Sequence, residues 1–118
     1  MNIFLFEVFP FAILLDPQMR MIHLGHSIKN VFPADTVLIG RYLEDVFRLV
    51  RPDILLEWNR VLSYGRHIVF VIESKIPLRS NPSSNMKKGG VNNSQIRLKG
   101  QMKLIAAWNM IVFLCHPV

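Results

Sequence analysis

The sequence predicts an α+β fold in which an antiparallel five-stranded sheet is covered by helices on one face. Three observations lead to it: two short β-type runs open the chain, helical spacing occupies the middle, and period-two alternation returns in the second half. The chain has 118 residues, of which 51% are hydrophobic. That length fits one domain, and that composition is sufficient for one hydrophobic core.

An opening hairpin is predicted at residues 11–24. The apolar run at 11–15 is closed by Asp16-Pro17, and residues 19–24 alternate until Gly25. Ser27 is then placed to cap a short helix that Pro33 stops.

Two further helices are predicted between residues 41 and 64. Pro52 is expected to end the first of them and to open the second. The first helix is supported by the i, i+3, i+4, i+7 spacing of Leu43, Val46, Phe47 and Val50. The apolar face of the second comprises Ile54, Leu55, Trp58, Val61 and Leu62. Gly65 is expected to cap its C-terminus.

Three strands are predicted in the second half. Residues 67–72 are β-branched and aromatic, residues 95–104 alternate between apolar and polar, and residues 110–115 are an unbroken apolar run. Residues 75–93 are rich in turn formers and predict a mobile surface loop.

Composition argues against several classes of protein. A single cysteine, Cys115, cannot form an internal disulfide, which favours a reducing, cytoplasmic location. The densest apolar stretch, residues 9–15, is too short to span a membrane. The formal charge is +6, but the basic residues are dispersed and no aromatic–basic stacking platform accompanies them. The sequence therefore predicts neither a membrane protein nor a nucleic-acid partner.

No catalytic residue, metal ligand or cofactor site is predicted. His23 and His26 are separated across Gly25, and no third ligand is near them in the sequence. Cys115 ends an apolar strand, where a core role is expected rather than nucleophilic chemistry. We therefore expect a domain that is not an enzyme.

An interface is the functional feature that the residues favour. Four phenylalanines lie within the first eleven residues, and the strands near 68–72 and 110–115 are apolar on both faces. Two alternatives stay open: the N-terminal segment folds back on its own sheet, or it crosses to a partner in an isologous dimer. Residues 1–8 are thus predicted as a dimer contact beside a domain at 9–118. The predicted dimer-interface residues are Phe4, Phe6, Phe9, Ile111 and Phe113.

A ligand-binding alternative is compatible with dimerisation. Trp58, Tyr42 and Met102 are candidates to line a cavity between sheet and helices. Such pockets are mostly apolar, so a small apolar ligand is expected there.

Several blocks resemble a known family. The general PAS pattern is resembled by Ile13-Leu14-Leu15-Asp16, Arg20-Met21-Ile22 and Leu38-Ile39-Gly40-Arg41. A narrower set is similar to the PAS-like domain of soluble guanylate cyclases, which also accompanies haem–nitric-oxide-binding domains in bacterial signal-transduction histidine kinases. That set includes Phe9-Pro10-Phe11, Leu49-Val50-Arg51-Pro52, Arg97-Leu98-Lys99-Gly100-Gln101-Met102 and Phe113-Leu114-Cys115.

This resemblance implies a PAS-like domain that pairs with an identical or related domain. It would relay a nitric-oxide or other gas signal from a separate haem sensor to an output domain, without binding haem itself. Residues 75–93 share nothing with the family, and the coiled coil and catalytic domain of the animal cyclases are missing. We therefore expect an excised part of a histidine kinase or a cyclase, with a kinase favoured.

Overall fold

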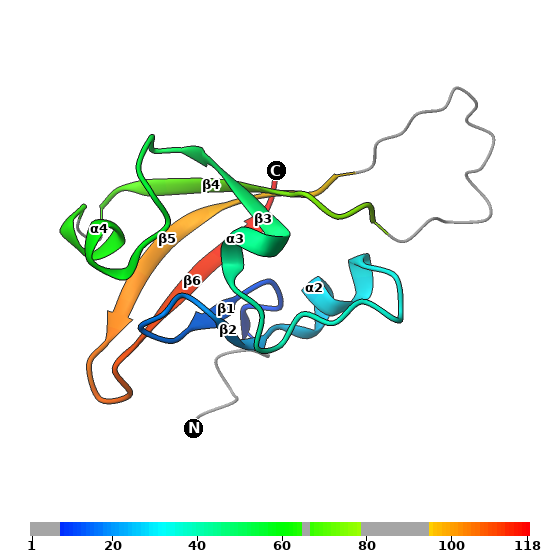
Figure 1. The fold of residues 1–118 in the computed structure, drawn as a ribbon, viewed down its shortest axis with the longest axis horizontal. Coiled ribbons are helices and arrows are strands. Elements are labelled where there is room, and N and C mark those ends of the chain that lie inside the picture. The colour runs from blue at the N-terminus through cyan, green and yellow to red at the C-terminus, as the bar shows by residue number, and fades with distance from the viewer. Residues whose placement is uncertain (1–7, 65–66, 79–94) are drawn as a thin grey trace.

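The computed structural model describes residues 8–64, 67–78 and 95–118. Strands and short helices alternate in the first half, and long strands dominate the second (Figure 1). In chain order the elements are β1 (Ile13–Leu15), β2 (Met21–Leu24), α2 (His26–Val31), α3 (Leu43–Val46), β3 (Phe47–Arg51), α4 (Trp58–Ser63), β4 (Val69–Ser74), β5 (Arg97–Ile105) and β6 (Met110–Pro117). The α+β class predicted from the sequence is confirmed.

The strands form one antiparallel sheet of six strands in the order β2-β1-β6-β5-β4-β3. The prediction of five strands was therefore wrong. The β5–β6 hairpin is the longest pairing and runs from Leu98↔Pro117 to Ile105↔Met110. Because β1 pairs with β6, the first and last strands lie side by side in the middle of the sheet.

The extra strand comes from residues 47–51, which were predicted as helix. The helical turn α3 lasts only from Leu43 to Val46, and Phe47 then adopts an extended backbone. Phe47 is fully buried and its ring packs edge-to-face on Phe32, with ring centroids 6.0 Å apart. Pairing with β4 supplies backbone hydrogen bonds along this segment. Tertiary packing thus overrides the helical spacing of this segment, because a helix of about two turns is only weakly stable by itself.

The predicted helix after Pro52 is also shorter than expected, because α4 begins only at Trp58. Residues 52–57 form tight bends instead, with the N–H of Ile54 donating to Pro52 O and that of Glu57 to Leu55 O. Consequently Leu55 is exposed and Leu56 is buried, the reverse of the predicted apolar face.

The helix predicted after Gly25 is confirmed as α2, but its predicted cap is not. The position before the helix is Gly25, with no side-chain capping bond. Ser27 lies inside the first turn, where its N–H donates to the carbonyl oxygen of Pro10.

The turn between β1 and β2 is built around Asp16. Its carboxylate, which is buried, accepts hydrogen bonds from the backbone N–H groups of Gln18 and Arg20, each at 2.9 Å. It also pairs with the Arg20 guanidinium at 2.9 Å. Met19 takes a left-handed backbone, with φ of 64°, to close the turn.

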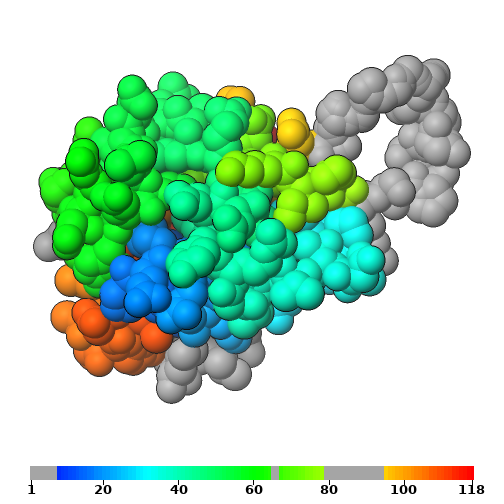
Figure 2. Space-filling model, in the orientation of Figure 1, coloured from blue at the N-terminus to red at the C-terminus, as the bar shows by residue number. Residues whose placement is uncertain are grey.

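The principal core lies between the sheet and the helical segments. Inward side chains of the sheet contact those of the segments between β2 and β4, and the largest fully buried rings are Phe32, Phe47, Phe70 and Phe113. Figure 1 is viewed from the helical side, and Figure 2 shows that side closed over the sheet by the N-terminal and central parts of the chain. The prediction that helices cover one face is consistent with this arrangement.

Several predicted features lie outside the described residues. They are the N-terminal segment up to residue 7, the Gly65 cap, and the part of the 75–93 loop from residue 79 onward. The first residues of that loop, 75–78, have no regular secondary structure.

Candidate functional site: an apolar patch on the outer face of the sheet

Two apolar clusters lie on opposite faces of the sheet because successive side chains of a strand alternate. Ile13, Leu15 and Phe113 belong to the principal core, whereas Leu14 and Val112 belong to a second cluster. We call the second cluster the outer apolar patch. It comprises Ala12, Leu14, Ile22, Ile105, Trp108, Met110, Val112 and Leu114.

The outer apolar patch is centred on β1 and β6. Ala12, Leu14 and Val112 are almost fully buried, and the other members are half-buried. This arrangement confirms that the last strand is apolar on both faces. The outer face of this part of the sheet therefore carries an organised apolar cluster, in keeping with a strand that is apolar on both faces.

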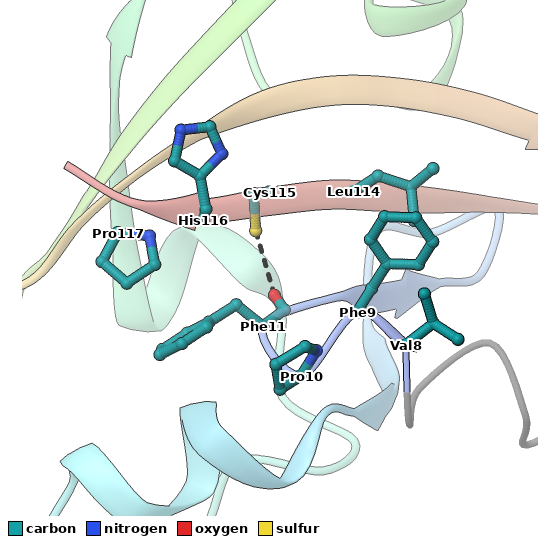
Figure 3. A pocket seen from close by; sticks show the side chains of 8 residues that line it. All are labelled: Val8, Phe9, Pro10, Phe11, Leu114, Cys115, His116 and Pro117. Atoms are coloured by element: carbon teal, nitrogen blue, oxygen red, sulfur yellow. Dashed lines mark hydrogen bonds between the residues drawn. The ribbon is translucent and has the colours of Figure 1, made fainter.

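A pocket of about 430 Å³ adjoins this patch at the end of β6. It is lined by Val8, Phe9, Pro10, Phe11, Leu114, Cys115, His116 and Pro117. Leu114 belongs to both the pocket and the outer apolar patch, so the two are continuous. Figure 3 shows Phe9 and Val8 beside Leu114, with Pro10 and Phe11 following along the same turn.

The turn that forms one wall of the pocket is fixed by its own backbone. The Ala12 N–H donates to Phe9 O at 3.0 Å, and the Gly25 N–H donates to Ala12 O at 2.8 Å. A side chain at Gly25 would meet the carbonyl oxygen of Pro10 at 2.1 Å, so only glycine permits this close approach. These contacts fix the turn of Phe9-Pro10-Phe11 against Gly25, and the Cys115 thiol joins it to the end of β6.

The one thiol in the pocket lining, that of Cys115, is engaged in a hydrogen bond. The Cys115 thiol donates to the carbonyl oxygen of Phe11 at 3.0 Å (Figure 3). Burial raises the pKa of this thiol well above its usual range, which disfavours the reactive thiolate. Cys115 is 7% exposed and belongs to the principal core, as predicted. The site is therefore suited to holding apolar groups rather than to nucleophilic chemistry.

The structure separates the predicted interface residues. Phe9 is 37% exposed at the pocket, whereas Ile111 and Phe113 are fully buried and face the helices. The last two are therefore not on the surface of the single chain, and their neighbours Val112 and Leu114 point outward instead. Phe4 and Phe6 lie outside the described residues.

Sequence reasoning missed Leu14, Trp108 and Leu114 as outward residues. An unbroken apolar strand has no polar positions to show which face is inward. The alternation in β5 carries that signal, because Met102 is inward and pairs with Phe113. Which side chains of β6 face the core becomes clear only once the β5–β6 register is known.

The residues proposed to line an internal cavity do not converge. Trp58 is half-buried against the principal core and Met102 is buried in it. Tyr42 is 47% exposed and forms an isolated bridge with Arg20, so its assignment to a core cavity was wrong.

The described residues contain neither a cluster of metal ligands nor a helix that could cross a membrane. His23 lies in β2 and His26 opens α2, and within the described ranges no three His, Cys, Asp or Glu side chains cluster as metal ligands would. None of the helices in the described part of the chain has the length and hydrophobicity needed to cross a membrane.

These features define a class of small α+β domain with an organised apolar surface on its sheet. Comparison with known families is consistent with that class. Residues 2–118 match the family described as heme NO binding associated, and the chain belongs to this family.

Curated relatives are soluble guanylate cyclases. The human guanylate cyclase soluble subunit alpha-2 is 28% identical over 112 residues, and the Caenorhabditis elegans soluble guanylate cyclase gcy-34 is 25% identical over 126. The rat guanylate cyclase soluble subunit beta-2 is 22% identical over 112 residues. These alignments cover 94%, 92% and 94% of this chain but only 14%, 18% and 15% of the relatives. The chain thus spans less than a fifth of the length of the relatives it matches.

Proposed function

We propose that this chain is a PAS-like signalling domain, itself non-catalytic, that pairs with an identical or related domain. In the parent protein it would relay a signal from a haem sensor to an output domain. Membership of the heme NO binding associated family supports this role. The relatives' names include alpha and beta subunits of soluble guanylate cyclase, which supports pairing and a cytosolic setting. The parent would be a cyclase-like protein or a histidine kinase.

The observation that carries the pairing proposal is the exposed apolar rim of the pocket, which continues into the half-buried members of the outer apolar patch. Phe9 and Val8 are exposed at the pocket rim, at 37% and 52%. Stable interfaces have an apolar, closely packed centre, and a partner that covered these residues would remove their apolar surface from water. Phe4 and Phe6 are the N-terminal residues that we propose to extend the same contact.

The pairing proposal is tested by the solution mass of the chain, measured by light scattering across concentrations up to about 100 μM. We expect a dimer for the wild type and a folded monomer for Phe9→Asp/Leu114→Asp, because two carboxylates would be buried without partners. Thermal unfolding followed by circular dichroism verifies that the variant is folded.

A matched control places the same charges on exposed apolar residues far from the patch. Val37→Asp/Leu55→Asp changes two side chains that are 65% and 58% exposed. This control is expected to remain a dimer. A wild-type monomer would contradict self-pairing, and equal effects of the two double variants would contradict this surface.

A second candidate function is the binding of a small apolar ligand. The pocket of about 430 Å³ is of the size that ligand sites occupy, and it favours the end of β6 over the core cavity expected from the sequence. The test is the binding of a hydrophobic fluorescent dye to the wild type and to Leu114→Trp, in which the larger side chain would fill the pocket. Dye binding that is lost in the variant would support this function, and unchanged dye binding would contradict it.

A further inference from the structure

The half of the outer face formed by β3, β4 and β5 carries a concentration of positive charge. We call its cations the basic half; they are Arg48, Arg51, Arg97, Lys99 and Lys103. On β5 these side chains point away from the core, because Leu98 and Met102 between them are buried. The outer face is therefore divided between the apolar patch and this charged surface.

Strand register assembles the basic half from three strands. Arg97 pairs with Glu73, and Glu73 pairs with Arg48. One step along the strands, Lys99 pairs with Val71, and Val71 pairs with Arg51. Paired residues of antiparallel strands share a face, so these cations lie across the same surface.

One carboxylate accompanies the five cations. Glu73 forms ion pairs with both Arg48 and Arg97, the latter at 3.4 Å. Hydrogen bonding to Arg48 and the nearby positive charges lower the pKa of Glu73, so it remains ionised. Arg51, Lys99 and Lys103 have no ion-pair partner within residues 8–64, 67–78 and 95–118. Five cations and one carboxylate give this surface a net charge of +4, compared with a formal charge of +6 for the whole chain.

The outer face of a second copy of the chain does not complement this surface. The described outer face of the copy would offer its own Glu73, which is already shared by two arginines, and the outer apolar patch. Facing cations with cations is repulsive, and facing them with apolar groups removes their hydration without compensation. Self-pairing through the outer apolar patch, which Lys103 borders at Val112, therefore leaves Arg48, Arg51, Arg97 and Lys99 available.

The side chains among the cations favour a protein partner over nucleic acid. Val69, Val71 and Gln101 share this face, and no aromatic side chain lies with them on the described parts of β3, β4 and β5. Proteins that bind single strands on a sheet stack bases on aromatic rings. Val69, at 42% exposed, offers a small apolar contact between charges instead.

We propose that the basic half docks an acidic protein surface that presents carboxylates beside short apolar side chains, on a partner other than a second copy of this chain. The proposal concerns cations that are not members of the outer apolar patch; because Lys103 pairs with Val112 of that patch, dimerisation is measured separately. Each unpaired cation would gain a charged hydrogen bond, and Val69 would be covered.

The test measures binding of a fluorescent peptide of alternating glutamate and valine by anisotropy. A peptide with glutamine in place of glutamate is the neutral comparison. We expect the wild type to bind the acidic peptide, with affinity falling as salt rises, and not to bind the neutral one. Lys99→Glu/Lys103→Glu should weaken binding by about tenfold or more, mainly through slower association. Lys99→Gln/Lys103→Gln, with less risk to folding, should show a smaller loss in the same direction.

The matched control has the same net charge and different placement. Lys29→Glu/Arg60→Glu reverses two exposed cations on α2 and α4 and should change affinity by less than about threefold.

Equal losses in the two reversed variants would overturn the proposal, because bulk charge would then explain binding. Tighter binding of single-stranded DNA or anionic vesicles through Lys99 and Lys103 would overturn the assigned partner class. Failure to bind the acidic peptide would overturn the docking itself. Light scattering of the same variants reports pairing separately.

Discussion

The thiol of Cys115 donates a hydrogen bond to the carbonyl oxygen of Phe11 at 3.0 Å, joining the last strand to the turn that precedes the first. This contact lies between the principal core and the surface pocket. It depends on the protonated thiol, because a thiolate cannot donate. The stability of this corner should therefore depend on pH.

Alkaline pH is expected to destabilise the protein through Cys115. Burial raises the pKa of the folded thiol, so the unfolded state loses its proton first, above the ordinary thiol pKa of about 8.5. The contribution is fully present below that pH and falls by about 1.4 kcal/mol per pH unit above it. Urea unfolding of the wild type and Cys115→Ala from pH 7 to 10 checks this. The difference between the two should shrink as pH rises; a constant difference would contradict the assignment.

Gly100→Ala is expected to destabilise the fold severely. A Cβ at this position would lie 2.0 Å from the carbonyl oxygen of Leu114 and 2.6 Å from the Cα of Cys115. These are backbone atoms of the paired strand and cannot rotate away, so we expect a loss of more than about 3 kcal/mol. Gly40→Ala is the comparison, since Gly40 has φ of 89° but nothing within 4 Å of a Cβ. Its cost should be about 1–2 kcal/mol, from backbone strain alone. Chemical denaturation measures both, and a smaller loss at Gly100 than at Gly40 would be inconsistent with the β5–β6 register.

Asp16→Ala is expected to cost about 2 kcal/mol in unfolding free energy, because it leaves two turn N–H groups without their acceptor. Asp16→Asn retains one acceptor oxygen and should cost less. Asp53→Ala, at an exposed carboxylate, should be nearly neutral. Thermal unfolding of the three variants ranks them, and an Asp53 effect as large as that of Asp16 would refute the turn's role.

Glu73→Gln is expected to alter stability only above acidic pH. The neighbouring arginines lower the pKa of folded Glu73, so its contribution is present above the unfolded pKa of about 4.3. It is lost as pH falls through the lowered folded pKa. Urea midpoints of wild type and variant should differ at pH 7 and converge at low pH. High salt should reduce the difference, because the ion pairs lie at the surface.

The clearest patterns in the sequence predicted the structure well. In β5 the alternation of Leu98 and Met102 with charged residues gives a strand with one buried side, as expected. Leu104 is the exception, since it lies near the hairpin end and is 49% exposed. Period-two alternation is reliable here because only one half of the strand's side chains can be buried.

Short segments were predicted less well, for a physical reason. The spacing of Leu43, Val46 and Phe47 fits a helix, yet Phe47 has to enter the core beside Phe32, which an extended backbone achieves. A helix of two turns gains too little from local hydrogen bonds to resist such packing. Ile111 and Phe113 show the complementary difficulty: their faces depend on pairing with β1 and β5, which no local pattern reveals.

The pairing of β1 with β6 has a consequence for biosynthesis. Ile13 can meet Phe113 only after all of the residues between them have left the ribosome, so the centre of the sheet is the last part of this domain to close during synthesis. Until then the edge of β1 that pairs with β6 is open, and Leu14 and Leu15 lie on an unpaired apolar strand that is prone to aggregation. Folding of this domain is therefore dominated by contacts between distant positions, and its sheet closes only when the last strand is free to pair.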